Sequence, residues 1–214
     1  YLDFPVVSGN VSFYNETQNK AIYPTPTIGG VGLIKDLNLM MTKNLKEVGS
    51  YLIIIGKTSG HLTQSEFFRE IVKIDDGPPP QINLFNEKNN GLSVLNLIKN
   101  KLVNAVHDIS SGGLIIALSE MCISGNIGAN IKIPNGKINI HEYLFSEDQS
   151  RYIVEINKKN MDKVSNILKE NSIYFEIIGK TENDNLIINN DTRMQISDLN
   201  KYNAYWFRNY FKDK

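Results

Sequence analysis

Ser50-Tyr51-Leu52-Ile53-Ile54-Ile55-Gly56 is the stretch that indicates the fold class most directly. An unbroken apolar run of this length predicts a strand that is buried on both faces of a sheet. A loop rich in glycine, serine and threonine follows at residues 57–65, and residues 66–72 are predicted to form a helix. This order of strand, loop and helix favours an anion cradle, because the first N–H groups of a helix have no partner inside it. The loop lacks the Gly-Lys-Ser/Thr ending of a Walker sequence, so a P-loop is not indicated.

The rest of the chain alternates between patterns typical of strands and of helices. Strands are expected at Val6–Tyr14, Ile22–Ile34, Val103–Asp108, 131–133, Arg151–Ile156, 174–179 and 186–188. Helices are expected at 84–102, 114–123, 162–169 and 196–211, with a short helical turn near 37–42. This alternation predicts an α/β or α+β fold.

The composition excludes several classes of protein. The 214 residues are 41% hydrophobic and 21% charged, as in soluble globular proteins. The 23 basic residues equal the 23 acidic ones, which argues against a nucleic-acid partner, since such a partner needs a basic face. No apolar run approaches the roughly 20 residues that span a bilayer, and no export signal is visible, so neither a membrane partner nor export is expected.

Cys122 is the only cysteine, and it lies in a segment that is apolar on nearly all sides. We expect it to be a buried core thiol in a reducing, cytoplasmic compartment. The chain begins at Tyr1 without an initiator methionine, and we interpret it as a piece of a longer polypeptide.

The segment Pro5–Glu16 carries the first group of candidate site residues. Gly9 permits a sharp turn and close approach to a phosphate. Asn10 offers an amide oxygen of the kind that Mg²⁺ accepts, and Ser12 would point to the same side in an extended chain. The alternative is an ordinary Ser-Gly-Asn loop.

Two further segments carry polar groups next to predicted strands. His107-Asp108 precedes Ser110-Ser111-Gly112-Gly113, which could form an anion site at a helix start, or a helix N-cap by Ser110 or Ser111 with His107 hydrogen-bonded in the fold. Glu147-Asp148-Gln149-Ser150-Arg151 could serve acid–base chemistry or phosphate binding, or it could be a solvated turn with a local ion pair. His61 and His141 lack the spacing of zinc ligands.

Five stretches in order resemble one known family. They are VVSGNVSFYNE at 6–16, YPTPTIGGVGL at 23–33, GPPP at 77–80, HDISSGGL at 107–114 and LFSEDQSR at 144–151. The chain resembles the second half of the synthetase subunit of the phosphoribosylformylglycinamidine synthase family, in the aminoimidazole-ribonucleotide-synthetase-like superfamily. The resemblance covers residues 2 to about 180. It implies the end of an N-terminal-type, ATP-binding domain at 1–46 and a C-terminal-type domain at 47–214.

The resemblance also implies an activity. The family converts formylglycinamide ribonucleotide, ATP and glutamine-derived ammonia to formylglycinamidine ribonucleotide, ADP and phosphate in purine biosynthesis, with ATP and Mg²⁺. Matched by position, Gly9 would contact ATP, Asn10 would bind Mg²⁺ and Ser12 would contact the substrate. The family's catalytic histidine and main metal ligands would lie upstream, so the chain alone is expected to be inactive. Its expected partners are the rest of the synthetase, a glutaminase subunit and a small accessory subunit.

Other readings remain open. The chain could be a non-catalytic structural or interaction module with a degenerate nucleotide pseudo-site, in which Gly112 and Gly113 contact an anion. Ser111, where the family has aspartate, and Thr63 favour this reading, and the substrate role of the family's Glu-x-Gln motif is not carried over to Glu147 and Gln149. A thiamine-monophosphate kinase or a selenophosphate synthetase would share the fold, but YPTP and HDISSGGL fit the amidine synthase better. The C-terminal helix with Trp206 could cap the domain or contact a glutaminase partner.

Overall fold

The structure is a computed structural model of the chain. It describes residues 1–22, 25–134, 136 and 138–212. Within the last of these ranges, the side chain of Trp206 is not described. Tyr23 and Pro24 of the YPTP motif, and the Trp206 side chain expected to cap the domain or contact a partner, lie outside the described residues. The chain divides into two compact units, Tyr1–Met40 and Met41–Lys214.

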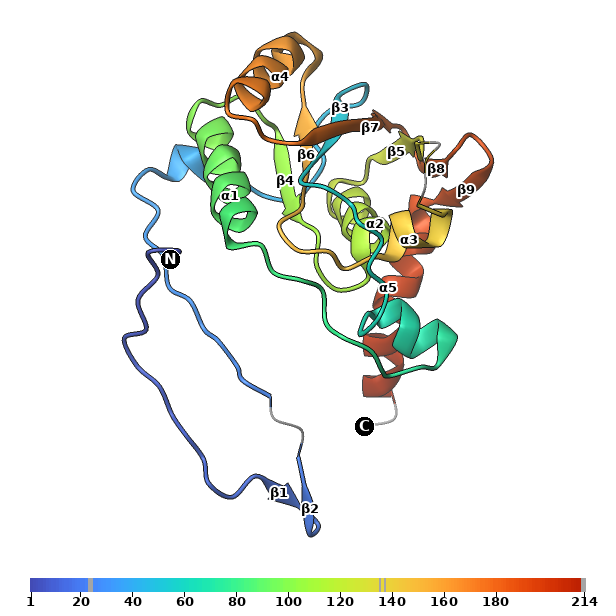
Figure 1. Cartoon of the computed structure of the whole chain (residues 1–214). Helices are drawn as coiled ribbons and strands as arrows, with labels where there is room; N and C mark the ends of the chain where they lie inside the picture. The colour runs from blue at the N-terminus through green and yellow to red at the C-terminus, as the bar shows by residue number, and fades with distance from the viewer. Residues whose placement is uncertain (23–24, 135, 137, 213–214) are drawn as a thin grey trace. The chain divides into compact units, whose positions relative to one another are not determined.

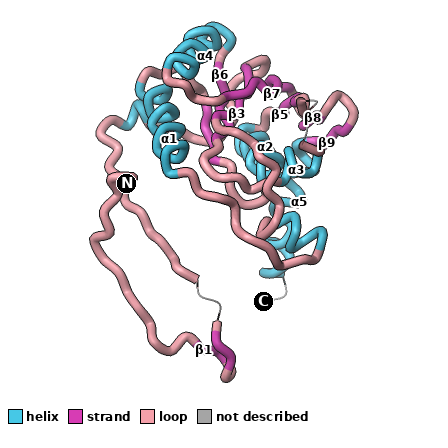
Figure 2. The backbone as a smooth tube through the Cα atoms, in the orientation of Figure 1, coloured by secondary structure: helices cyan, strands magenta, loops and turns pink. Residues whose placement is uncertain are grey.

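Unit 1 consists mainly of loop, drawn in dark to mid blue in Figure 1 and in pink in Figure 2. Among its described residues, β1 (Glu16–Thr17) pairs with β2 (Lys20–Ala21) in a hairpin. Gln18 and Asn19 make the turn with φ of 53° and 61°, as a two-residue hairpin loop requires. A 3₁₀ turn at Leu37–Leu39 is capped by Asp36, whose carboxylate accepts the N–H of Asn38 at 2.9 Å.

The strands expected at Val6–Tyr14 and Ile22–Ile34 are wrong for the described residues. Their apolar side chains are exposed, and most of them almost fully, as in Val7 at 92%, Phe13 at 93% and Val31 at 95%. A strand forms only where a neighbouring strand satisfies its backbone N–H and C=O groups. None of the described residues of these two segments lies in a strand, and Ile22, whose N–H donates to the carbonyl of Asn15 at 2.9 Å, only extends the β1–β2 hairpin by one bond.

Unit 2 is built on a seven-stranded sheet with the strand order β4-β6-β3-β7-β5-β8-β9. Every neighbouring pair is antiparallel except β5 with β8. The strands are β3 (Tyr51–Ile55), β4 (Ala105–Asp108), β5 (Gly128–Ile131), β6 (Tyr152–Ile156), β7 (Phe175–Glu182), β8 (Asn185–Ile188) and β9 (Thr192–Gln195). The apolar run of β3 therefore lies in the interior of the sheet, between β6 and β7, as its unbroken apolarity predicts.

Helices cover the two faces of this sheet (Figure 1). Leu52 and Ile54 point into a core with α2 (Gly113–Gly125), α3 (Ile140–Phe145) and the start of α5 (Ile196–Lys212). Ile53 and Ile55 point the other way, into a core with α1 (Leu84–Lys99) and α4 (Met161–Glu170). A three-layer α+β architecture results, which confirms the predicted fold class.

The predicted boundary after residue 46 stays a prediction. Residues just before it are held by unit 2, because Leu45 is buried in the α2 core and the N–H groups of Lys46 and Glu47 bind the carboxylate of Glu155 at 2.8 and 3.0 Å. Glu155 itself lies fully buried on β6. Among the described residues, no helix combines the length and the apolarity that crossing a bilayer requires.

Candidate functional site

The predicted site residues of unit 1 lie together in an exposed loop. The Nδ2 of Asn10 donates to the hydroxyl of Ser12 at 3.3 Å, and Asn15 donates to the carbonyl of Ser12 at 2.8 Å. Space around Gly9 is open, since a Cβ there would meet nothing within 4 Å. The loop thus brings Asn10 and Ser12 to one side, as expected, and leaves both accessible.

Mg²⁺ is the metal that the resemblance implies for this loop. An amide oxygen fits one position in its shell, because Mg²⁺ usually takes only one or two protein oxygens beside substrate phosphates and water. Among the described residues, no group of three or more His, Cys, Asp or Glu side chains is placed to hold a metal ion. Asn10 could therefore supply one ligand of a shared site, and not a complete site.

A second candidate region lies at one end of the unit 2 sheet. Asp108 of β4 and Ile55 of β3 both pair with Tyr152, the first residue of β6. The loops that leave β3 and β4 therefore meet the segment that enters β6, residues 146–151. This topology brings together three polar stretches that are up to 89 residues apart in sequence.

Glu147 and Asp148 bind the backbone of both loops. One oxygen of Glu147, Oε1, accepts the N–H of Glu66 and the N–H of Gly112, each at 2.8 Å. Asp148 accepts the N–H of Ser59 at 2.8 Å and of Gly60 at 2.9 Å, with a longer contact of 3.4 Å from His61.

Arg151 holds the same segment from inside the protein. Its guanidinium donates to the carbonyl of Ser146 at 2.6 Å, the carbonyl of Asp148 at 3.1 Å and the hydroxyl of Thr58 at 3.1 Å. The side chain is 1% exposed, and this burial lowers the pKa of Arg151, opposed by the charges of Asp148 and Glu147. Asp148 and Arg151 are thus buried, Glu147 and Ser150 are half-buried and Gln149 is exposed. The solvated turn weighed from sequence therefore holds only for Gln149.

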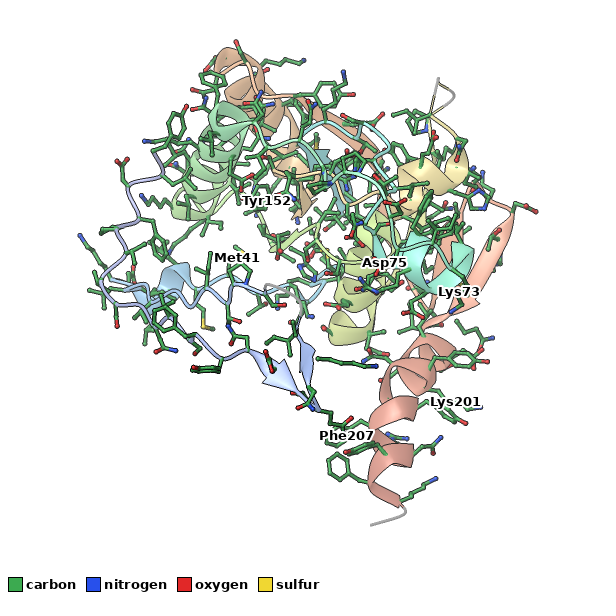
Figure 3. All side chains as sticks on the ribbon, turned by 60° about the horizontal axis from the view of Figure 1, so that its bottom comes forward. Met41, Lys73, Asp75, Tyr152, Lys201 and Phe207 are labelled. Atoms are coloured by element: carbon green, nitrogen blue, oxygen red, sulfur yellow. The ribbon has the colours of Figure 1, made fainter. Side chains whose placement is uncertain are left out.

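Gln149 and Ser150 line two clefts. The first, of about 290 Å³, is lined by Glu87, Asp108, Ser110, Ser111 and Tyr152 among others. Burial, together with the charges of Glu87 and Asp108, raises the pKa of the Tyr152 phenol. Figure 3 labels Tyr152 where β6 begins. The second cleft, of about 230 Å³, is lined by Asn86 and Asn90 of α1, together with Lys57 and Asp148.

Gly112 and Gly113 occupy the start of α2 with φ of 80° and 72°. A Cβ on Gly113 would lie 2.7 Å from the backbone of Phe145, so only glycine fits there. The N-cap is Gly112, and no side chain caps the helix, so the alternative of a cap by Ser110 or Ser111 is wrong. An external anion at these glycines stays a prediction.

His107 lies inside the fold, as one of the two readings has it. Its Nε2 lies 3.0 Å from Glu120 and its Nδ1 lies 3.2 Å from Asp108. Lys43 also binds Glu120, and this hydrogen bond, more than that of His107, lowers the pKa of Glu120 against the opposing effect of burial. His107 and Lys43 therefore meet at Glu120, and all three residues lie within unit 2.

Comparison with known proteins gives one family. The model of the family "AIR synthase related protein, C-terminal domain" matches residues 47–188. The phosphoribosylformylglycinamidine synthase subunit PurL of Pelagibacter ubique is 54% identical over 213 residues, which cover 100% of this chain and 29% of the relative. The same subunit of Rhodopseudomonas palustris is 40% identical over 99% of this chain and 29% of the relative. The chain spans about 29% of the length of these relatives.

Solved structures share the fold. The chain resembles T. maritima PurL complexed with FGAR, with a TM-score of 0.63 and 19% identity over 77% of this chain and 30% of that one. T. maritima PurL complexed with ATP gives a TM-score of 0.60 at 18% identity, over 77% of this chain and 28% of that one.

Proposed function

Because the chain belongs to the AIR synthase related family, we propose that it forms part of an ATP-dependent synthetase that makes formylglycinamidine ribonucleotide from formylglycinamide ribonucleotide and ammonia. The observation that carries the proposal is the 54% identity to a phosphoribosylformylglycinamidine synthase subunit along the whole chain. ATP and formylglycinamide ribonucleotide as ligands rest on the two complexes of the T. maritima relative. The proposed partners are the rest of the synthetase, a glutaminase subunit that supplies ammonia, and a small accessory subunit.

In this proposal the unit 1 loop supplies one rim of the site. Gly9 contacts ATP through its backbone, Asn10 offers its amide oxygen to Mg²⁺, and Ser12 contacts the substrate. When bound, Mg²⁺ offsets negative charge on the transferring phosphoryl group. The hydrogen bond between Asn10 and Ser12 supports the assignment, because it holds the two side chains on one side of the loop.

A hybrid enzyme tests the proposal. The 213-residue matching segment of the Pelagibacter ubique subunit is replaced by this chain, and ammonia-dependent formation of ADP and of the amidine product is measured. The expected result is turnover within about tenfold of the parent subunit. A hybrid that folds but turns over no faster than an enzyme-free control would contradict the proposal.

A second candidate is a non-catalytic module with a degenerate pseudo-site. The observation that favours it is the Gly112 N–H, which already has an intramolecular carboxylate partner. The two candidates differ in the hybrid enzyme: substitutions at Asn10 and Ser12 lower turnover only if the loop takes part in the reaction.

A further inference from the structure

The adjacent carboxylates of Glu147 and Asp148 accept hydrogen bonds from the backbone N–H groups that an anion-binding loop would offer to a ligand. Glu147 accepts from Glu66 and Gly112, and Asp148 accepts from Ser59 and Gly60. These donors come from the two loops that leave β3 and β4, where the sequence predicts anion contacts. Each donor is a group that a phosphate would need, and each is engaged within normal hydrogen-bond distance.

Glu147 is the central contact of this arrangement. Its single oxygen Oε1 bridges Glu66 and Gly112, which are 81 and 35 residues away in sequence. An ionised carboxylate makes stronger hydrogen bonds to N–H groups than a neutral acceptor does. The geometry is that of a bound oxyanion, with the difference that this anion is part of the chain.

The charges around the first cleft oppose a second anion. Besides Glu147, the cleft is lined by the carboxylates of Glu87 and Asp108. The only cationic side chain among its described lining residues is Arg151, whose three nitrogens are occupied by Ser146, Asp148 and Thr58. A phosphate entering here would meet like charge. The N–H of Gly112, next to the lining residue Ser111, is already bound to Glu147.

We propose that Glu147 is a built-in ligand of the two loops and determines the specificity of this cleft by excluding phosphate and other oxyanions. The inference is independent of the proposed synthetase activity, because it concerns only contacts within unit 2. It replaces the expected external anion at Gly112 and Gly113 by the chain's own carboxylate.

Removing the internal carboxylate tests the proposal. Amide NMR shifts of Glu66 and Gly112 are followed in the ¹⁵N-labelled chain, in Glu147→Ala and in Glu170→Ala, while sodium acetate, sodium sulfate or ADP is added. Glu170 is an exposed carboxylate at the end of α4 and is the matched control. We expect no saturable shift at these two amides in the unsubstituted chain or in Glu170→Ala. In Glu147→Ala we expect a saturable shift with acetate or sulfate, together with a rise in melting temperature that the controls do not show.

Two outcomes would overturn the proposal. One is a saturable shift at Gly112 with sulfate or ADP in the unsubstituted chain. The other is a folded Glu147→Ala variant whose Glu66 and Gly112 amides respond to none of the three anions.

Glu147→Gln keeps the proposal testable if Glu147→Ala does not fold. It preserves the shape of the side chain and removes its charge, so hydrogen exchange at Glu66 and Gly112 should accelerate about tenfold, because charge-assisted bonds are roughly twice as strong as neutral ones. Exchange at Asn171, which binds Ile167 in α4, should not change. Unchanged exchange at Glu66 and Gly112 would show that the charge of Glu147 does not hold the loops.

Discussion

At the scale of single residues, Arg151 combines charge with nearly complete burial. Its three hydrogen-bonded nitrogens reach residues 58, 146 and 148, so one side chain ties the β3 loop to the segment entering β6. Truncation would leave two carbonyls and a hydroxyl without their donor, and Asp148 and Glu147 without their nearby cation. Leaving such buried acceptors unpaired costs more than a typical exposed substitution does.

We therefore predict that Arg151→Ala lowers the free energy of unfolding by about 3–5 kcal/mol, because it leaves buried acceptors unpaired and opens a cavity. Urea unfolding followed by circular dichroism measures the change. Arg208→Ala on α5 is the control, because Arg208 is exposed, and it should shift the free energy by less than about 0.5 kcal/mol. Equal effects of the two substitutions would show that the hydrogen bonds of Arg151 do not contribute to the free energy of unfolding.

Cys122 is predicted to be chemically inert in the folded chain. Burial raises the pKa of its thiol to about 12, and the side chain is fully buried in α2. Only the thiolate reacts with iodoacetamide, so alkylation at pH 8.5 should be slow until a denaturant unfolds the chain. Because the folded pKa is raised, the thiol's contribution to stability is full below its ordinary pKa and is lost as the pH rises towards 12. Rapid alkylation without denaturant, measured by mass spectrometry, would contradict this burial.

Asn10 is predicted to act on the chemical step. In the hybrid enzyme, Asn10→Ala should lower kcat by about 10- to 100-fold, the range that loss of a metal's supporting groups produces. Asn203→Ala, at an exposed position on α5, is the matched control and should leave kcat unchanged. An unchanged kcat for Asn10→Ala at limiting Mg²⁺ would contradict the proposal that Asn10 binds the metal.

At the scale of elements, α1 offers a direct comparison of a buried and an exposed leucine. Leu97 is 0% exposed in the core with α4, whereas Leu95, on the same helix, is 49% exposed. Leu97→Ala should cost about 2–5 kcal/mol of unfolding free energy, because it leaves a cavity. Leu95→Ala should cost less than about 1 kcal/mol, since helix propensities of leucine and alanine differ little. Thermal and urea unfolding of both variants would test the assignment of the helix face, and a reversed order would show that it is wrong.

The sequence predicted those strands and helices in which the spacing of apolar residues matches the side chains that are buried. Residues 51–55, 152–156 and 161–170 form the expected strands and helix, because their apolar side chains repeat at the period of the structure that buries them. The short helix α3 was not predicted, although Asn139 and Glu142 form a capping box that could have indicated it. β9, at residues 192–195, was also not predicted, because its side chains are largely exposed at the edge of the sheet and its pattern is polar.

The candidate site shows where sequence reasoning stops. Glycine and serine residues between a predicted strand and a predicted helix pointed to the two loops, but this pattern could not show what their N–H groups bind. The partners of Gly112 and Ser59 lie 35 and 89 residues away, on a segment brought to them by the pairing of β6 between β3 and β4. A contact set by sheet order has no signature in local sequence.

At the scale of the whole molecule, the buried core and the residues predicted to bind ligands belong to different units. Every buried apolar side chain of the described residues lies at Leu45 or beyond, whereas Gly9, Asn10 and Ser12 lie in exposed loop. Stability of a domain comes mainly from buried apolar area, so unit 2 should fold without residues 1–40. The proposed function, by contrast, would require those residues together with groups from the rest of a synthetase.

We predict, accordingly, that stability and activity can be separated by one truncation. Removal of residues 1–40 from the chain should shift the melting temperature by less than about 4 °C, the shift that roughly 1 kcal/mol produces in a domain of this size. The same deletion in the hybrid enzyme should abolish amidine synthesis, because it removes the proposed contacts to ATP, Mg²⁺ and substrate. The intact 214-residue chain alone should also lack ATP turnover, since Asn10 is one ligand where phosphoryl transfer needs several groups fixed in place. Calorimetry of the truncated chain and ADP release by the hybrid measure the two effects. A truncated chain that fails to fold would show that residues 1–40 contribute to the core, and an active truncated hybrid would remove the loop from the reaction.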